Sequence, residues 1–246
     1  MKLIIDTSSL LWSSLLAGSD VEAKTVNHNG ADIKVNTAEY GYENAVNSVV
    51  KSLADWKLTP KDCIFAVEGR DSKKRRSFID PGYKAKRGNR PPEAYVEFNR
   101  LKAKLVETFR NLGAIVCTQD FVEADDVIAW LVENTEEDCV VVSRDNDLIV
   151  LNGVNRFGAK CFVSINGEVG KNTYGDFDFK LVTLYKCTVG DTSDSVPGCR
   201  GFGPAAFLNL LARYQEDGLF ELMYLIRDGK LNELAVLAKD NQCKIL

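Results

Sequence analysis

Acidic side chains stand at or shortly after the ends of four short apolar runs, and this is the pattern with the clearest chemical meaning. The acids concerned are Asp6, Glu68, the group Glu123, Asp125 and Asp126, and the pair Asp145 and Asp147. Clustered carboxylates repel one another, so they stay ionised together only where cations neutralise them. Because ligand sets made only of oxygen select Mg²⁺ or Mn²⁺ over zinc, the pattern predicts a divalent metal site. Taken singly, each acid could instead be a helix cap or a surface charge.

Two more carboxylates, Asp191 and Asp194, stand just before a glycine-rich loop. Acids three residues apart can meet on one side of a helical turn and hold a divalent cation. Gly198, Gly201 and Gly203 leave backbone N–H groups unshielded, and such groups at the start of a helix bind phosphate. This segment therefore predicts a metal site beside a phosphate site. The alternative is a polar loop with an N-capping aspartate.

Basic residues are concentrated between residues 70 and 90. This stretch holds nine basic and two acidic residues, whereas the whole chain has a formal charge of −4. A basic segment on an acidic body indicates a polyanion held over a carboxylate-rich site, although a solvated charged loop would have the same composition. Phe78 and Tyr83 interrupt the charges and would suit stacking on bases. The predicted DNA contacts are Lys73, Lys74, Arg75, Arg76, Tyr83, Lys86, Arg90, Gly198, Arg200, Gly201 and Gly203.

The nine carboxylates are numerous enough to serve two cations. Two metal ions about 3.5–4 Å apart can hold the attacking and leaving oxygens of a phosphodiester displacement, and one can also generate hydroxide. A basic group that neutralises the developing charge would complete such a site, and Lys84 and Arg87 are the candidates. The residues together predict metal-dependent phosphodiester hydrolysis.

Strand and helix patterns alternate along the chain and would position these groups. Apolar runs predict strands at 3–5, 63–67, 114–117 and 139–142, and Asn166-Gly167 predicts a hairpin within 156–170. Helical patterns cover 42–56, 92–112, a segment from 123 onward, 180–189, 205–214, 219–228 and 230–239. This alternation predicts an α/β fold with a mainly parallel central sheet and helices on both faces. The acids then fall at the carboxyl edge, where open α/β sheets place their sites.

The composition is that of an ordinary globular protein, with 246 residues, 45% apolar and 27% charged. Seven scattered cysteines without a C-x-x-C pair predict buried, reduced thiols rather than disulfides or a zinc site. No apolar run approaches the roughly 18 residues of a membrane span, and Asp6 interrupts the apolar core that a signal peptide requires. We expect no membrane association and a cytoplasmic location.

An ordered set of short motifs resembles the 5′-nuclease family. The motifs are Asp6, Val67-Glu68-Gly69, Tyr83-Lys84-x-x-Arg87, Glu123-Ala124-Asp125-Asp126, Asp145-x-Asp147 and Gly190-Asp191-Thr192-Ser193-Asp194-x-Val196-Pro197-Gly198-x-x-Gly201-x-Gly203. That family includes flap endonucleases, the 5′-nuclease domains of bacterial DNA polymerases and stand-alone phage 5′→3′ exonucleases, and the chain looks most similar to the phage enzymes. The similarity covers about residues 2–215, and its last motif is the most specific.

The resemblance implies a role for most of the candidate residues. It assigns Glu123, Asp125, Asp126 and Asp145 mainly to one Mg²⁺ or Mn²⁺, and Asp147, Asp191 and Asp194 to a second. Lys84 and Arg87 would contact the scissile phosphate, and residues 70–100 would form a basic helical arch. Residues 1–178 would be the nuclease core, and 179–246 a helix–three-turn–helix region that binds duplex DNA, with K⁺ at its loop.

The implied activity is hydrolysis at 5′ ends and flaps of duplex DNA in replication or degradation, with RNA primers as further substrates. The resemblance also implies a monomer in the cytoplasm of a bacterium or a phage-infected host cell. Two departures stand out: Glu68 replaces the usual aspartate, and Pro204 stands close to where the family commonly has a lysine. The alternatives are a PIN-like Mg²⁺-dependent ribonuclease, which would lack the basic arch and the glycine-rich segment, and a catalytically silent DNA-structure binder of the same fold.

Overall fold

The computed structural model describes residues 1–16, 24–28, 31–35, 37–79, 81–83, 92–192 and 196–230. Its elements in chain order are β1 (Lys2–Asp6), α1 (Thr7–Leu16), β2 (Lys24–His28), β3 (Ala31–Val35), α2 (Thr37–Asp55), η1 (Pro60–Asp62), β4 (Cys63–Glu68), α3 (Lys74–Ile79), α4 (Pro92–Asn111), β5 (Ile115–Gln119), α5 (Ala124–Asn134), β6 (Cys139–Ser143), η2 (Asn146–Leu151), β7 (Gly153–Val154), β8 (Lys160–Ile165), β9 (Glu168–Val169), η3 (Phe179–Leu181), α6 (Val182–Val189) and α7 (Pro204–Arg227).

Seven strands form the central sheet, in the order β5-β4-β1-β6-β8-β7, with β9 paired to β8. The pairs β1–β4, β1–β6, β4–β5 and β6–β8 are parallel, and only the short strands β7 and β9 run antiparallel. The four apolar runs predicted as strands therefore lie side by side. The predicted hairpin is also present, with Asn166 and Gly167 at positive φ in its turn.

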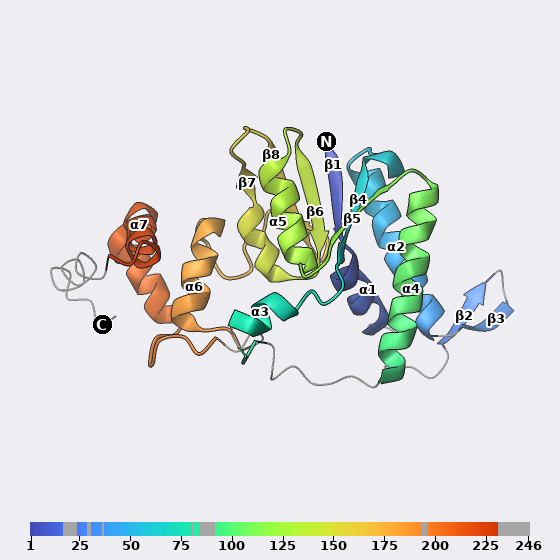
Figure 1. Ribbon diagram of the computed structural model, residues 1–246, viewed down its shortest axis with the longest axis horizontal. Coiled ribbons are helices and arrows are strands. Elements are labelled where there is room, and N and C mark those ends of the chain that lie inside the picture. The colour runs from blue at the N-terminus through green and yellow to red at the C-terminus, as the bar shows by residue number, and fades with distance from the viewer. Residues whose placement is uncertain are drawn as a thin grey trace. The chain divides into compact units, whose positions relative to one another are not determined.

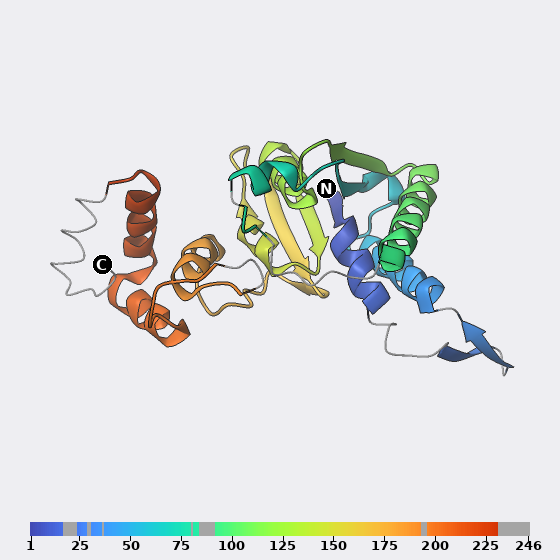
Figure 2. The ribbon, with the colours of Figure 1, turned by 60° about the horizontal axis from the view of Figure 1, so that its bottom comes forward.

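Helices cover both faces of this sheet, as the sequence predicted (Figures 1 and 2). Leu3, Ile5 and Phe65 belong to one buried cluster with side chains of α1, α2 and α4. Side chains alternate along a strand, so Ile4 points to the opposite face, where α5 packs on β1, β4 and β5. Both faces are apolar, which explains why these strands have continuous apolar sequences.

The order in which successive strands are added to the sheet changes sides at β1. From β1 it passes outward to β4 and β5, and then returns to place β6 on the other side of β1. In open α/β sheets, ligands bind outside the carboxyl ends of strands at such a switch point. The position that topology alone selects for a ligand therefore lies at the ends of β1 and β6, next to Asp6 and Ser143.

Contacts along the chain divide it into two compact units. One comprises Met1–Ile79 and Gly88–Lys171, and the other comprises Asp80–Arg87 and Asn172–Leu246. In the second unit, Phe207 of α7 packs against Phe177 and Tyr185, with ring centroids 5.2 Å and 5.0 Å away. Gln215 has a non-helical backbone inside α7, so the two helices predicted at 205–214 and 219–228 are joined across a kink.

Two expectations need correction or completion. The sequence analysis did not predict helix α1. Cys187 and Cys199 were expected to be buried, but both are exposed. The six cysteines among the described residues are all free thiols, and Cys63, Cys139 and Cys161 are buried. None of the described helices is long and apolar enough to cross a membrane. The predicted helix at 230–239 lies outside the described residues beyond position 230.

Candidate active site

Asp6 ends β1 and is buried at the switch point. Its Oδ2 accepts a hydrogen bond of 2.6 Å from the Ser143 hydroxyl, and its Oδ1 accepts one of 3.2 Å from the backbone N–H of Ser9. The pKa of Asp6 is raised to about 7, mainly by burial, although the two hydrogen bonds lower it. The negative charges of Asp125 and Glu68 make smaller contributions in the raising direction. Three of the predicted acids, from β1, β4 and α5, therefore share one electrostatic environment.

Ser143 joins the ends of the two strands that flank the switch point. Besides donating to Asp6, its hydroxyl oxygen accepts a 2.9 Å hydrogen bond from the backbone N–H of Asp145. The Asp145 carboxylate in turn caps η2 by accepting from the backbone N–H of Asp147 at 3.0 Å. These bonds fix Asp145 at the carboxyl end of β6, next to the end of β1.

Glu68 ends β4, and the chain turns tightly after it. Its Oε2 accepts a hydrogen bond from the Ser8 hydroxyl at 2.5 Å and lies 3.7 Å from the Lys102 ammonium nitrogen. A Cβ on the following residue, Gly69, would lie 1.8 Å from the carbonyl oxygen of Gln119, so only glycine fits there. This close approach keeps the end of β4 against the end of β5.

The acids at the start of α5 surround a guanidinium group. Nη1 of Arg76 lies 2.7 Å from Oε2 of Glu123 and 3.6 Å from Oδ2 of Asp125. Nη2 of Arg76 donates to Oδ1 of Asp126 at 2.7 Å. Glu123 occupies the N-cap position of α5, but its side chain makes no capping hydrogen bond. Glu123 therefore does not cap α5 with its side chain, although one acid of this cluster was considered as a possible helix cap.

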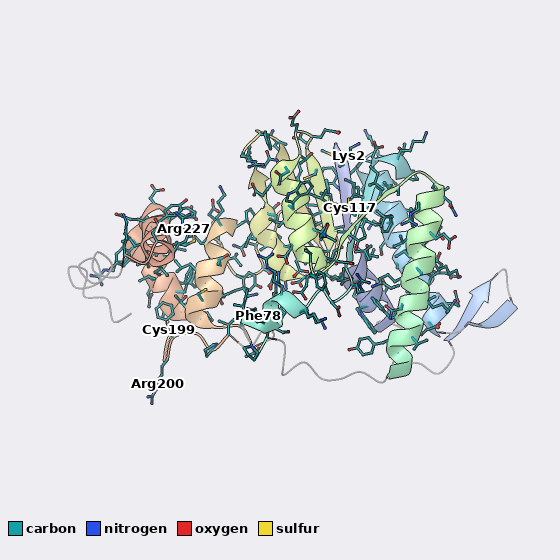
Figure 3. The ribbon with its side chains drawn as sticks, in the orientation of Figure 1. Lys2, Phe78, Cys117, Cys199, Arg200 and Arg227 are labelled. Atoms are coloured by element: carbon teal, nitrogen blue, oxygen red, sulfur yellow. The ribbon has the colours of Figure 1, made fainter. Side chains whose placement is uncertain are left out.

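In the second unit, Asp191 follows α6 and forms an ion pair with Lys186 of that helix. Both side chains are largely buried, and Asp191 also exchanges two backbone hydrogen bonds of 2.8 Å with Val196. Gly198 has φ +67°, and a Cβ there would lie 2.6 Å from the backbone nitrogen of Gly190, so the loop closes on itself through glycine. Figure 3 shows Arg200 pointing away from this loop into solvent.

Other predicted residues are placed as follows. Lys73 precedes α3, whereas Lys74 and Arg75 lie on it with Arg76, and Tyr83 lies in a turn at 81–83. Gly201 has φ +75° with open space around it, and Gly203 is the N-cap residue of α7. The remaining candidates lie outside the described residues: Lys84, Lys86, Arg87, Arg90 and Asp194.

The sequence analysis missed the neutral and basic partners of the acids. Ser8, Ser9 and Ser143 donate to or organise carboxylates, and Lys102 and Lys186 pair with Glu68 and Asp191. A local signal existed for the serines, because they stand beside predicted strand ends. No spacing rule links Lys102 to Glu68, which lies on another element. Lys186 and Asp191 are five residues apart, which is not one of the spacings that pair side chains along a helix.

The donor chemistry of the first unit fits a hard divalent cation. The side chains at this edge offer carboxylate oxygens, and three of them already hold a cation in the form of the Arg76 guanidinium. Burial is the main cause of the raised pKa of Asp6, and the neighbouring negative charges of Asp125 and Glu68 add to it in smaller part. As they stand, no three acidic, histidine or cysteine side chains within the described ranges form a ready metal-binding group. A cation bound by these carboxylates would therefore require them to rearrange and Arg76 to leave.

A model of the family described as "5'-3' exonuclease, N-terminal resolvase-like domain" matches residues 1–168. The chain belongs to this family. The 5'-3' exonuclease of Mycoplasma genitalium is 32% identical over 215 residues, which are 82% of this chain and 70% of that protein. The chain is accordingly a nuclease, and the resemblance seen in its motifs is confirmed at the level of the family.

Solved structures agree with this assignment at the level of the fold. A phage T5 5'-exonuclease with bound divalent zinc ions has a TM-score of 0.62 at 16% identity, covering 98% of this chain and 92% of that one. A complex of the phage T5 flap endonuclease with DNA and metal ions also has a TM-score of 0.62 at 16% identity, covering 86% and 74%. At this identity the likeness supports the predicted α/β fold and no individual residue role.

Proposed function

We propose that this chain is a divalent-metal-dependent 5′→3′ exonuclease and flap endonuclease that hydrolyses duplex DNA at 5′ ends and flap junctions. The observation that carries the proposal is the gathering of Asp6, Glu68, Asp125 and Asp145 at the switch-point edge of the sheet in a chain of the 5'-3' exonuclease family. The T5 neighbours are described with divalent metal ions and with DNA, which supports both requirements.

We assign the first cation to Glu123, Asp125, Asp126 and Asp145, with Asp6 and Glu68 beside them. A bound Mg²⁺ or Mn²⁺ would lower the pKa of water and neutralise charge on the phosphate. The buried Asp6, held by Ser143 and Ser9, suits the orientation of ligands and attacking water rather than free movement. On the family resemblance, Asp147, Asp191 and Asp194 serve the second cation.

Substrate contacts in this proposal come from the basic segment and the glycine loop. Lys84 and Arg87 would stabilise the scissile phosphate, and Lys73, Lys74, Arg75, Arg76, Lys86 and Arg90 would guide the 5′ end, with Tyr83 stacking on a base. Gly198, Gly201 and Gly203 would admit duplex phosphates to the backbone near a K⁺ ion, and the exposed Arg200 would add a phosphate contact. The helix–three-turn–helix form of this region, RNA–DNA hybrids as substrates, a monomeric state and a cytoplasmic site of action belong to the same proposal.

The direct test is cleavage of a 5′-labelled flap duplex and a blunt duplex with Mg²⁺ and with EDTA, resolved on a denaturing gel. We expect metal-dependent products at the 5′ end or the flap junction, whose lengths distinguish exonuclease from endonuclease action. Tight binding of flap DNA without cleavage would favour the silent structure binder. Cleavage confined to single-stranded RNA would favour a PIN-like ribonuclease.

A further inference from the structure

The cation that the α5 acids hold is part of the chain itself. The Arg76 guanidinium is within 2.7 Å of carboxylate oxygens on both Glu123 and Asp126, and within 3.6 Å of one on Asp125. These are the same carboxylates that the proposed function assigns to a divalent ion. A guanidinium donates hydrogen bonds in a fork that suits two carboxylates at once, so this arrangement is a good substitute for a metal ion.

The burial of Glu123 makes its ion pair with Arg76 energetically important. The side chain of Glu123 is only 5% exposed, and the side chain of Arg76 is 33% exposed. A buried carboxylate without a partner is costly, so Glu123 requires a cation in every state in which it is ionised. Among the described residues, Arg76 is a cationic partner of Glu123, with its Nη1 2.7 Å from the carboxylate.

Arg76 also attaches an otherwise loosely held helix. Helix α3 has no buried residue, and its two apolar side chains, Phe78 and Ile79, are 90% and 76% exposed. Figure 3 shows Phe78 on α3. With so little apolar surface removed from water, the ion pairs of Arg76 with the α5 acids supply a major link between α3 and the sheet.

We propose that Arg76 is an internal counter-cation that competes with the divalent metal for the α5 carboxylates and whose release on metal binding frees α3. The inference rests on the proposed function, because it requires that these carboxylates bind a metal. Arg76 must leave Glu123, Asp125 and Asp126 before their oxygens can serve as ligands. Helix α3, which lies within the basic stretch 70–90, would therefore be set free only in the metal-loaded protein.

Basic side chains also pair with two other predicted metal ligands. Lys102 lies 3.7 Å from the Glu68 carboxylate, and Lys186 pairs with Asp191. Arg76 differs because it holds three carboxylates of one cluster, one of them buried. It is therefore the position at which competition with a metal should be most visible.

The test compares metal affinity in the wild type, Arg76→Gln and a matched control, Arg75→Gln, without DNA. Arg75 is exposed on the same helix and lacks an ion pair with any described residue, so the control removes the same charge without vacating the carboxylates. Mn²⁺ and Ca²⁺ binding are followed by isothermal titration calorimetry. Because the metal no longer has to displace a guanidinium group, we expect Arg76→Gln to bind about tenfold more tightly, a change of about 1.4 kcal/mol.

The direction of the change separates competition from simple structural support. If Arg76 merely held the acids in place, Arg76→Gln would bind metal more weakly, and that result would overturn the inference. Equal affinity in all three proteins would overturn the inference while leaving the proposed metal site intact. Absence of binding in every protein would overturn the proposed metal site and the inference together.

Hydrogen–deuterium exchange gives a second readout that does not depend on activity. In the wild type, Ca²⁺ should accelerate exchange of the α3 amides, because Arg76 no longer attaches the helix. In Arg76→Gln, exchange should already be fast and should not respond to Ca²⁺. Metal binding that leaves α3 protected in the wild type would contradict the proposed release.

Discussion

Several buried or partly buried carboxylates among the described residues have a specific polar neighbour. Asp6 accepts from Ser143 and Ser9, Glu68 accepts from Ser8, and Asp191 pairs with Lys186. Asp6 has only neutral donors among these contacts, and burial raises its pKa to about 7. A carboxyl in that state gains most from a nearby cation, since the cation would restore its charged form.

Thiol reactivity tests burial at the scale of single residues. Burial raises the pKa of the Cys63 thiol to about 12, and Cys139 and Cys161 are also buried, whereas Cys187 and Cys199 are exposed. Because the thiolate is the reactive form, iodoacetamide at pH 8 should label Cys187 and Cys199 first.

Peptide mass spectrometry of the labelled protein locates the modified thiols. In urea, all of these cysteines should become labelled, which controls for detection. Labelling of Cys63 in the folded protein as fast as Cys187 would contradict the described packing.

Residue types and spacing were sufficient to find the acids but not their partners. Asp6, Glu68 and the α5 cluster were recognisable because each follows an apolar run. Arg76 looked like one of several DNA-contacting cations, and its ion pairs with α5 arise from tertiary structure that no local pattern encodes. Whether Arg76 also contacts DNA stays a prediction.

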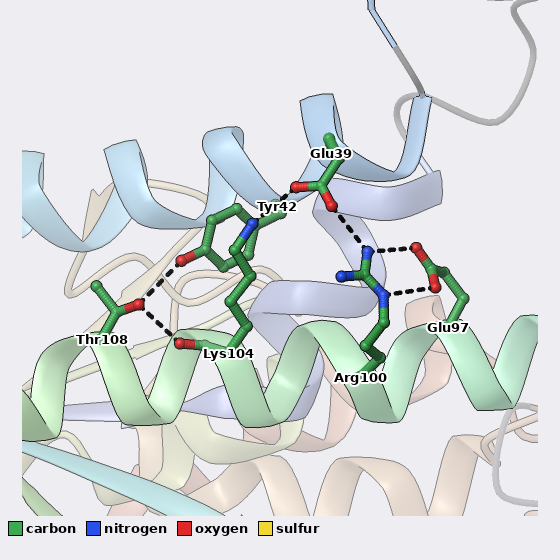
Figure 4. Close-up of polar contacts among 6 residues, drawn as sticks. All are labelled: Glu39, Tyr42, Glu97, Arg100, Lys104 and Thr108. Atoms are coloured by element: carbon green, nitrogen blue, oxygen red, sulfur yellow. Dashed lines mark hydrogen bonds and ion pairs between the residues drawn. The ribbon is translucent and has the colours of Figure 1, made fainter.

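At the scale of elements, a network of polar contacts joins α2 to α4 (Figure 4). Glu39 of α2 accepts hydrogen bonds from Arg100 at 2.8 Å and Lys104 at 2.9 Å, and Tyr42 bonds to Thr108 at 3.1 Å. The hydrogen bonds from Arg100 and then Lys104 lower the pKa of Glu39. The network therefore links the helix before β4 to the helix before β5.

Replacing Glu39 with glutamine should lower the free energy of unfolding at pH 7 by about 0.5–1 kcal/mol, as for other exposed ion pairs. A carboxyl with a lowered folded pKa adds stability above its unfolded pKa and loses that contribution as the pH falls through the folded value. The difference between the wild type and Glu39→Gln should therefore shrink below about pH 4 and in high salt.

Urea denaturation at pH 7 and pH 3 measures this difference. Glu43→Gln is the matched control, since Glu43 is exposed on the same helix and forms no ion pair with a described residue. A loss of stability in Glu39→Gln that persists unchanged at pH 3 would show that the charge is not responsible.

The main strands and most helices were predictable because their signals are local. β1, β4, β5 and β6 are apolar runs between polar segments, and the kink at Gln215 separates two helical patterns. Helix α1 was missed because it is buried widely, with Leu10, Leu11 and Ser14 all inaccessible, so it lacks an amphipathic stripe. The parallel pairing of β8 with β6 was also not predictable, because it depends on contacts that no local sequence pattern encodes.

At the scale of the whole molecule, alternation of strands and helices predicted the fold class, and the order of the strands then selects one edge for the site. Family membership agrees with both, because the family model covers residues 1–168, which contain β1 to β9 apart from the end of β9. The predicted domain boundary at residue 178 stays a prediction. It can be compared with the two compact units, of which the second resumes at Asn172.

The central claim is that the carboxylates at this edge bind the metal that a 5′ nuclease needs. The most direct measurement is the single-turnover rate of 5′-flap cleavage in saturating Mg²⁺ by the wild type, Asp125→Asn and Glu133→Gln. Glu133 is an exposed acid near the other end of α5, so it controls for charge, and circular dichroism confirms folding. We expect Asp125→Asn to be slower by about a hundredfold or more, because a metal ligand contributes several kcal/mol to the transition state, and Glu133→Gln to match the wild type. A folded Asp125→Asn protein that cleaves at the wild-type rate would contradict the account.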